Sequence, residues 1–471
     1  MKFELNNIGL IDNTKIELSD LTILCGENNT GKTYATYSIY GFYKFWRPLL
    51  RKEIKNSIEK ALEESTNSQI DLNSIFLGKI NFYLKKISDK YAKEYLFRVF
   101  ASSESFFDNS EFIANLSEEP KKINFEKPYF RSILGANKEP VATINKKENS
   151  SVLEILVTNI SEKDLDLTFQ ISEAVQKIVF EPYFIDIFIA SAERTGATIF
   201  SKDLSFHQTR AIEALTKQKK NSNKDPDYLP FLIMREMFEN RYPTPVEDNV
   251  EFIRDLETAS KKTSEMTKES PQTLQAFEQV VGGKYKVVKN SGICFYPKGA
   301  GKKFSMTESS SAIRALLDLN FYLQCLAKKG DLLMIDEPEL NLHPTNQRAF
   351  SRLIARLVNY GIKVFVTTHS DYIIKELNTL IMLNKKTNLT KNIQKKYGYK
   401  DEELLDFKKI KLFTTTAGFT ITADKKSKVS AKYILKESVI TEDNGIEVET
   451  FDKNIDQMNE IQNEILFGDA L

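Results

Sequence analysis

The chain has 471 residues, of which 41% are hydrophobic and 28% are charged. These values are typical of a folded globular protein with two or three domains, and they exclude an intrinsically disordered chain. Because 66 basic residues are offset by 65 acidic ones, the overall charge gives no indication of nucleic-acid binding.

The N-terminal segment has none of the features of an exported or membrane protein. Residues 1–7 lack the long apolar core of a signal peptide, and no segment approaches the length of a membrane span. Cys25, Cys294 and Cys325 lack the spacing of a metal site and are expected to be free thiols in a reducing compartment. We therefore expect a cytoplasmic protein without a membrane partner.

A glycine-rich loop follows the first predicted strands, which are an alternating segment at 2–18 and an apolar run at 21–25. Aromatic residues at helical spacing come after the loop. Strand, glycine loop and helix are the context in which a P-loop holds phosphates through backbone N–H groups and a helix N-terminus. Lys32 is expected to reach the β- and γ-phosphates, and the Thr33 hydroxyl to coordinate Mg²⁺. The sequence therefore predicts a site for ATP and Mg²⁺ formed by Gly26, Glu27, Asn28, Asn29, Thr30, Gly31, Lys32 and Thr33.

The sequence changes character from about residue 46 to residue 277. Heptads are not sustained, so we do not expect a long coiled-coil arm. An apolar run at 185–190 predicts a buried strand that leads to Glu193 and Arg194. The remainder is mostly polar and helical with some strands, and its clearest helical stretches are 50–65, 77–100 and 204–277.

The C-terminal part alternates strands with helices. A β-ribbon is predicted at 284–305 and a long helix at 310–327. The apolar runs 332–335 and 362–367 each precede a helix, which is the pattern of a parallel α/β sheet. The last part of the chain is rich in lysine, then strand-like, and ends in a predicted helix at 455–467.

Two acidic residues and a histidine follow these apolar runs. Asp336 is expected at the carboxyl edge of the sheet, where ligands bind and where it would hold Mg²⁺. Glu337 beside it is the candidate general base for an attacking water. The alternative is an acidic pair that caps a helix before Pro338. His369 follows the next run and is placed to contact the γ-phosphate, with a structural histidine as the alternative.

A serine run, Ser309, Ser310 and Ser311, precedes the long predicted helix. Serines at a helix start are first of all N-caps, and the local sequence favours that interpretation. The same hydroxyl and N–H groups are also suited to a phosphate of a nucleotide held by another subunit.

These elements in this order resemble an ABC-type ATPase of the branch that contains SMC, RecF and OLD (overcoming lysogenisation defect) proteins. The run Asp336-Glu-Pro-Glu-Leu-Asn-Leu-His-Pro is particularly similar to OLD-family ATPases. No clear Gln loop is visible in the sequence. We expect Glu193 and Arg194 to take the place of the Gln loop, and the alternative is that they form a buried ion pair. The matching segments are 26–33 for Walker A, 332–337 for Walker B, 309–311 for the signature serine, 340–344 for the D-loop and His369 for the switch histidine.

The resemblance implies an α/β fold, with an ABC-type P-loop ATPase head and a large, mostly helical insertion between Walker A and the signature motif. Residues 1–45 and 278–400 would form the discontinuous, two-lobed head. Residues 46–277 would form the insertion, and residues 401–471 would add strands and a helix packed on the head.

The resemblance also implies a mechanism, in which the protein is a homodimer or a higher homo-oligomer. Two heads associate head to tail, and each ATP lies between one subunit's P-loop and the other's signature serine. ATP closes the dimer and hydrolysis reopens it. Lys32, Glu337 and His369 would be the catalytic residues.

The chain shows no convincing Toprim nuclease signature after His369. The resemblance therefore favours a sensor or scaffold subunit that controls a separate effector, a nuclease or toxin, in anti-phage defence. The alternative is a RecF-like repair ATPase that contacts DNA through the basic stretch 385–411, although such a run is more often a solvated surface. A transporter subunit fits less well because of the large insertion.

Overall fold

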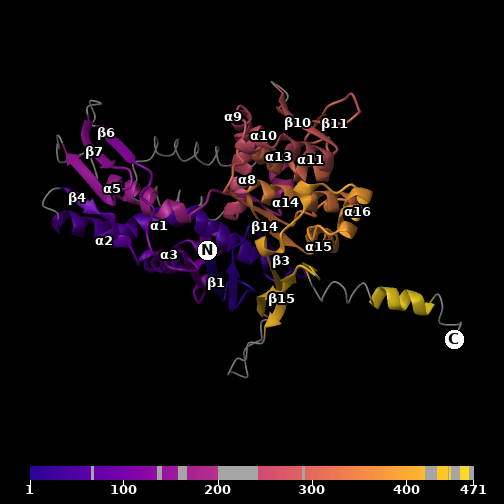
Figure 1. The fold of residues 1–471 in the computed structure, drawn as a ribbon, viewed down its shortest axis with the longest axis horizontal. Helices are drawn as coiled ribbons and strands as arrows, with labels where there is room; N and C mark the ends of the chain where they lie inside the picture. The colour runs from indigo at the N-terminus through magenta and orange to yellow at the C-terminus, as the bar shows by residue number, and fades with distance from the viewer. Residues whose placement is uncertain are drawn as a thin grey trace, which may run out of the picture.

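A six-stranded sheet forms the centre of the protein (Figure 1). The computed structural model describes residues 1–64, 68–134, 140–157, 167–199, 242–288, 292–418, 432–443, 445–446 and 457–465. The strand order is β16 (Lys432–Ser438), β15 (Ile410–Gly418), β3 (Leu21–Cys25), β14 (Lys363–Thr368), β13 (Leu332–Asp336) and β9 (Ile187–Ala190). All neighbours are parallel except β15 and β16. The predicted parallel α/β sheet is therefore confirmed.

The central strands are apolar throughout because both faces of the sheet are covered. Every residue of β3 and β13 is buried. Alternate side chains enter two different cores, since Met334 packs on the side of α1 (Lys32–Glu64) and Leu333 on the other side. Buried parallel strands of this kind read as continuous hydrophobic runs.

Helices of the C-terminal part cover the face opposite α1 (Figure 1). The predicted helix at 310–327 is two helices, α12 and α13, that meet at Leu316. The helices of this part and of the segment before it are α8 (Thr244–Arg254), α9 (Leu256–Ala259), α10 (Glu265–Glu269), α11 (Pro271–Val281), α12 (Ser311–Ala315), α13 (Leu317–Cys325), α14 (Pro344–Tyr360), α15 (Asp371–Leu383) and α16 (Asn388–Tyr397). The predicted ribbon is confirmed as β10 (Gly283–Val288), β11 (Gly292–Pro297) and β12 (Phe304–Ser305).

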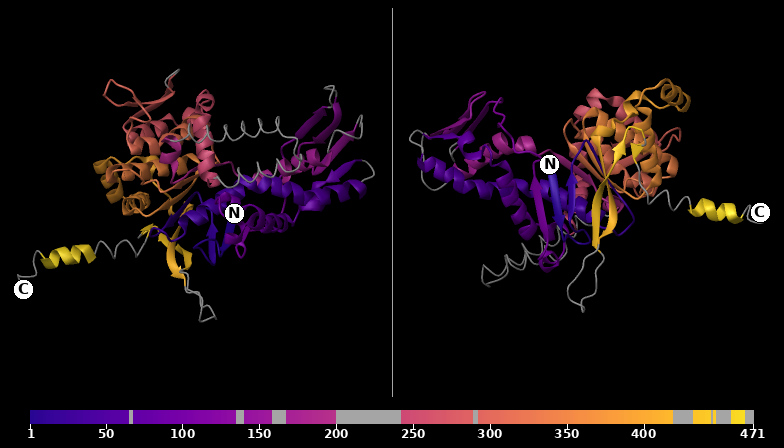
Figure 2. Two further views of the ribbon diagram at one scale, coloured as in Figure 1. Left: turned by 180° about the vertical axis from the view of Figure 1, so that it is seen from behind. Right: turned by 60° about the horizontal axis from the view of Figure 1, so that its bottom comes forward.

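The insertion extends along α1 to a second sheet at its far end (Figure 2). This sheet has the order β4 (Gln69–Asp71), β8 (Val152–Val157), β7 (Pro140–Lys146) and β6 (Tyr129–Leu134). A small sheet nearer the head joins β2 (Thr14–Glu17), β1 (Lys2–Asn6) and β5 (Glu111–Asn115). The helices of the insertion before β9 are α1 with α2 (Leu72–Phe76), α3 (Ile80–Glu94), α4 (Leu96–Val99) and α5 (Leu167–Val175), which continues into the π-helical turn η2 (Gln176–Phe180).

Several elements cross the boundaries expected from the sequence. Helix α1 runs past residue 45 to Glu64, and β9, from the range assigned to the insertion, is an edge strand of the central sheet. The apolar run at 185–190 explains this, because it needs a neighbour that covers it. The predicted helical stretch 204–277 lies partly outside the described residues, which resume at 242 and there contain α8 to α11. The division into head and insertion at 45 and 277 stays a prediction.

The C-terminal part contributes β15 to the central sheet beside β3, whereas its terminal helix does not pack on the head. Strand β15 lies there because its residues at 410–413 supply buried apolar side chains. Residues 457–465 form the predicted helix, but each of them is exposed and the helix stands away from the central sheet and its helices (Figure 1). The expectation that this helix packs on the head is therefore not met. Strands β17 (Ile440–Thr441) and β18 (Gly445–Ile446) form a small ribbon.

Among the described residues, every helix is too short or too polar to cross a lipid bilayer.

A glycine in α1, Gly41, permits a close contact with Tyr91 and Val99, and its replacement tests this packing. A Cβ at Gly41 would overlap the Tyr91 hydroxyl and Val99, and that hydroxyl donates a buried hydrogen bond of 2.7 Å to the Ser38 carbonyl. We expect Gly41→Ala to reduce the free energy of unfolding by about 1–3 kcal/mol through overpacking. Thermal unfolding of the purified protein measures this. The control is Gly196→Ala, whose Cβ meets no atom within 4 Å; equal midpoints for the two variants would contradict the prediction.

Candidate nucleotide site

The loop between β3 and α1 is held in a conformation that requires glycine. Gly31 has φ +93°, and a Cβ there would lie 2.7 Å from Ile11 Cγ1. A Cβ at Gly26 would collide with the Thr415 hydroxyl of β15. The loop therefore packs against neighbouring elements closely enough to exclude side chains, and its amides stay open to a phosphate.

Lys32 is the first residue of α1, and its side chain folds back over this loop. Its ammonium donates to the carbonyl oxygens of Gly26 at 3.0 Å and Glu27 at 2.7 Å, and the residue is buried. Burial lowers the pKa of Lys32, and the nearby Glu337 opposes that shift. Thr30 closes the same loop by donating to the Glu27 carbonyl at 2.7 Å. The predicted phosphate-binding lysine is thus in position at the N-terminus of α1.

Thr33 and Asp336 come together although they are 303 positions apart in the chain. The Thr33 hydroxyl donates to Asp336 Oδ2 at 3.3 Å, and the Thr367 hydroxyl donates to Oδ1. Asp336 is fully buried, which raises its pKa to about 6. A hydroxyl beside a buried carboxylate is an oxygen donor pair that suits Mg²⁺, which needs few protein ligands when phosphates and waters supply the rest. The residues present therefore fit the predicted magnesium site.

Glu337 occupies a strained backbone position next to His369. Its φ is +52°, and its N–H donates to the Thr367 hydroxyl at 3.0 Å. His369 Nδ1 lies 3.7 Å from Glu337 Oε1, and the nearness of the imidazole lowers the pKa of Glu337 while the carboxylate raises that of His369. Glu337 is therefore ionised at neutral pH, as a general base must be.

The sequence analysis gave no role to Glu339, which organises the same corner. This residue is buried, and burial raises its pKa. Its Oε1 accepts from the Thr368 hydroxyl at 2.8 Å and from the His369 N–H at 2.7 Å, and it lies 3.2 Å from His369 Nδ1. Glu339 thus fixes the end of β14 and the position of the histidine. The only sequence signal was its place two residues after Glu337.

A buried arginine joins three parts of the site. The guanidinium of Arg194 donates to the carbonyl oxygens of Ser191 at 2.8 Å, Asp336 at 2.6 Å, Glu337 at 2.7 Å and Ala315 at 2.8 Å. These carbonyls belong to the end of β9, to the Walker B-like segment and to the helix α12. Arg194 is bonded to backbone carbonyls here, in place of the ion pair that the sequence left open.

Glu193 points to α1, where its Oε2 accepts from the Tyr37 hydroxyl at 2.7 Å. The segment after β9 therefore contacts both sides of the site. Whether Glu193 and Arg194 serve as a Gln loop stays a prediction.

The serine run lies at the start of α12. The exposed Ser310 is the N-cap, and its hydroxyl accepts from the Ile313 N–H at 3.5 Å. Ser309 is buried and donates to the Ser305 carbonyl at 2.8 Å, while Ser311 begins the helix. Within the described residues, the hydrogen bonds of Ser309 and Ser310 join the run to its own loop and helix, not to the P-loop. The capping interpretation is confirmed, and a contact with a second subunit's nucleotide stays a prediction.

The sheet thus brings together the residues expected at its carboxyl edge, namely Lys32, Thr33, Asp336, Glu337 and His369. No group of three or more His, Cys, Asp and Glu side chains in the described part of the chain is arranged to hold a metal by itself.

The comparison with protein families agrees with a nucleotide site at this edge of the sheet. The sequence profile of the family described as AAA ATPase domain matches residues 1–374. No curated protein matches the chain.

Among solved structures, the chain is similar to the SMC head domain from Thermotoga maritima, at 11% identity and a TM-score of 0.28, over 80% of this chain and 90% of that chain. A second match is the SmcHead bound to the C-winged helix domain of ScpA, at 13% identity and 0.32, over 93% and 97%. A third is the Smc head domain with an extended coiled coil bound to the C-terminal domain of ScpA derived from Pyrococcus furiosus, at 12% and 0.31, over 98% of each chain. At these scores the likeness adds no argument to the strand order described above.

The profile match covers most of the chain and includes the glycine loop, the Asp336–Glu337 pair and His369. With these residues assembled at one edge of the parallel sheet, the chain belongs to the AAA ATPase domain family and has the fold of an ABC-type P-loop ATPase.

Proposed function

We propose that this chain binds and hydrolyses ATP as a head-to-tail homodimer and is the sensor or scaffold subunit of an anti-phage system that controls a separate nuclease or toxin. The observation that carries the ATPase part is the convergence of Lys32, Asp336 and Glu337 at the carboxyl ends of β3 and β13. The defence role rests on the resemblance of the 336–344 run to OLD-family ATPases.

The chemistry follows from the side chains at this edge. The Lys32 ammonium exchanges the Gly26 and Glu27 carbonyls for phosphate oxygens. Thr33 and Asp336 would hold Mg²⁺, which would supply positive charge to offset that of the β- and γ-phosphates. Glu337 accepts a proton from the attacking water. The water oxygen forms a bond to the γ-phosphorus, and the bond from that phosphorus to the β–γ bridging oxygen breaks. His369, held by Glu339, donates to the departing phosphate.

Arg194 offers a route from hydrolysis to dimer opening. It donates to the Glu337 carbonyl and also to the Ala315 carbonyl of α12, whose N-cap Ser310 is exposed. If the Glu337 backbone moves when phosphate is lost, Arg194 would move with it. Because Arg194 also bonds α12, that helix and the proposed subunit interface would shift as well. Such a two-state connection is what a nucleotide-dependent switch requires.

The proposal of a separate effector rests on the lack of a convincing Toprim signature after His369 in the sequence. The RecF-like alternative is favoured by one observation: α16 exposes Lys391, Lys395 and Lys396. Other lysines of that stretch are ion-paired, Lys385 with Asp443 and Lys411 with Glu17. This reduces the positive charge available to DNA.

The first test is Glu337→Gln, which preserves ATP binding and removes the base. We expect kcat to fall about 10²–10⁴-fold. Mass photometry with ATP is expected to show an accumulated dimer or larger assembly, with or without duplex DNA. Pull-down from the native host is then expected to capture a nuclease-like or toxin-like protein.

The matched control is Lys32→Ala, which removes the phosphate contact and is expected to remain unassembled. A Glu337→Gln enzyme that turns over at the normal rate would refute the base assignment. Assembly that requires DNA and captures no effector would favour the repair ATPase.

Ser310→Ala tests the contact between subunits. We expect the cap loss to cost about 0.5–2 kcal/mol of stability, and ATP turnover to fall while ATP binding by the monomer persists. Isothermal titration and a phosphate-release assay separate the two effects. Ser264→Ala is the control, since Ser264 caps α10 in the same way; an equal change of turnover in both variants would leave Ser310 as a cap only.

Arg194→Lys tests the positioning role of the arginine. Lysine keeps the charge but cannot bond carbonyls of three elements at once. We expect kcat to fall roughly tenfold or more with KM for ATP little changed, because Lys32 and its loop are not touched. An unchanged kcat in a folded variant would mean that the guanidinium is structural only.

A further inference from the structure

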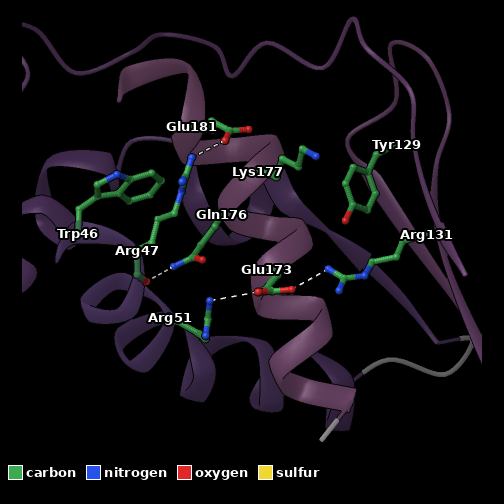
Figure 3. A pocket seen from close by; sticks show the side chains of 9 residues that line it. All are labelled: Trp46, Arg47, Arg51, Tyr129, Arg131, Glu173, Gln176, Lys177 and Glu181. Atoms are coloured by element: carbon green, nitrogen blue, oxygen red, sulfur yellow. Dashed lines mark hydrogen bonds and ion pairs between the residues drawn. The ribbon is translucent and has the colours of Figure 1, made fainter. Parts of the chain in front are cut away.

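A pocket of about 320 Å³ lies in the insertion, away from the nucleotide site (Figure 3). Its walls are α1, strand β6 and the continuous helix formed by α5 and η2. The pocket is separate from the P-loop, because Arg47 on its wall is roughly 22 Å along α1 from Lys32. Its volume lies at the lower end of the range of small-molecule sites.

The pocket carries more positive than negative charge. Arg51 and Arg131 share one carboxylate, that of Glu173, at 3.2 and 2.7 Å. Arg47 pairs with Glu181 at 2.7 Å. Lys177 also lines the pocket and is exposed. Three guanidinium groups and one ammonium thus face two carboxylates, which leaves an excess of positive charge at the pocket.

Two of the arginines are held in place by aromatic rings. The Arg51 guanidinium stacks on the Phe169 ring at 4.1 Å, and that of Arg47 lies over Trp46 at 5.2 Å. Arg51 Nε is buried without a hydrogen-bond partner in the described residues. Guanidinium groups fixed in this way need little reordering to bind phosphate oxygens in pairs.

One wall of the pocket is a π-helical turn. The residues Gln176–Phe180 follow α5 directly in this rare geometry, which is frequent at functional sites. The wider turn places Gln176 so that its side-chain amide donates to the Arg47 carbonyl, beside Pro48, and it turns Lys177 to the pocket. Such a turn interrupts the regular helix, so its presence here is independent support for a binding role.

We infer that this pocket binds a small phosphate-bearing ligand of about mononucleotide size, through Arg47, Arg131 and Lys177. Tyr129, half-buried on β6, lines the same pocket and presents an aromatic ring for a planar group of the ligand (Figure 3). The site is independent of the proposed ATPase cycle.

The test measures binding in the Lys32→Ala protein, which removes the P-loop contribution. Isothermal titration with AMP and with inorganic pyrophosphate at low salt is expected to show one saturable site per chain. Arg47→Gln combined with Lys177→Gln is expected to weaken that binding roughly tenfold or more, since each removes charge-assisted contacts. Both residues are exposed, so the fold is not at risk.

Lys55→Ala is the control, because Lys55 lies on the same helix, is exposed, and pairs with Glu59 outside the pocket. No saturable binding of either probe, or equal loss in Lys55→Ala, would overturn the inference. Binding of a single-stranded oligonucleotide without binding of AMP or pyrophosphate would also overturn it and assign the surface to nucleic acid. Binding in the Lys32→Ala protein tests the pocket alone. If the P-loop binds no nucleotide, the unmodified protein will show the same single site, and the proposed function fails while the pocket inference stands.

Discussion

Parallel pairing of β3, β14 and β13 is the interaction on which the nucleotide site depends. The register joins Leu24 with Thr367 and Asp336 with the same threonine, so the three strands end at one level. The glycine loop, the acidic pair and His369 therefore leave the sheet at one edge. Side chains alternate along a strand, so a slip of one residue would turn Asp336 away from Thr33. The register is protected by burial, since a slip would also exchange the side chains of two packed cores.

Buried charged side chains are the second constraint, and they are compensated largely by hydrogen bonds to backbone groups and hydroxyls. A charged group removed from water is costly unless it is paired or hydrogen-bonded. Arg194 meets this requirement with four carbonyl oxygens. Glu339 Oε1 accepts from a hydroxyl and an N–H, and Asp336 accepts from two hydroxyls, yet burial raises the pKa of both carboxyls. A cation beside Asp336 would stabilise its ionised form.

Helix α1 connects the phosphate-binding loop to the insertion. It begins at the phosphate-binding lysine and continues into the aromatic core of the insertion, where it packs against α3 and α5. The same helix carries Arg47 and Arg51 on the wall of the charged pocket. The phosphate-binding lysine and one wall of the pocket thus lie on the same helix. In this fold the insertion is therefore attached to the head through continuous structure.

The sequence by itself determined the fold class, the position of the phosphate loop and the acidic pair. These features are local. An apolar run that ends in a charged residue, or a glycine loop before a helix, can be recognised from a few neighbouring residues without the tertiary structure. The sequence also indicated the strand at 185–190, because that run is too apolar to be exposed. Tertiary structure alone decided that this strand joins the head, that α1 crosses the expected boundary at 45 and that the last helix stands free. It also decided the contacts of Arg194, the role of Glu339 and the pocket of the insertion. Each of these features depends on contacts between segments that are distant in the chain. Such contacts are stabilised by surfaces that both segments bury, so neither segment alone indicates them.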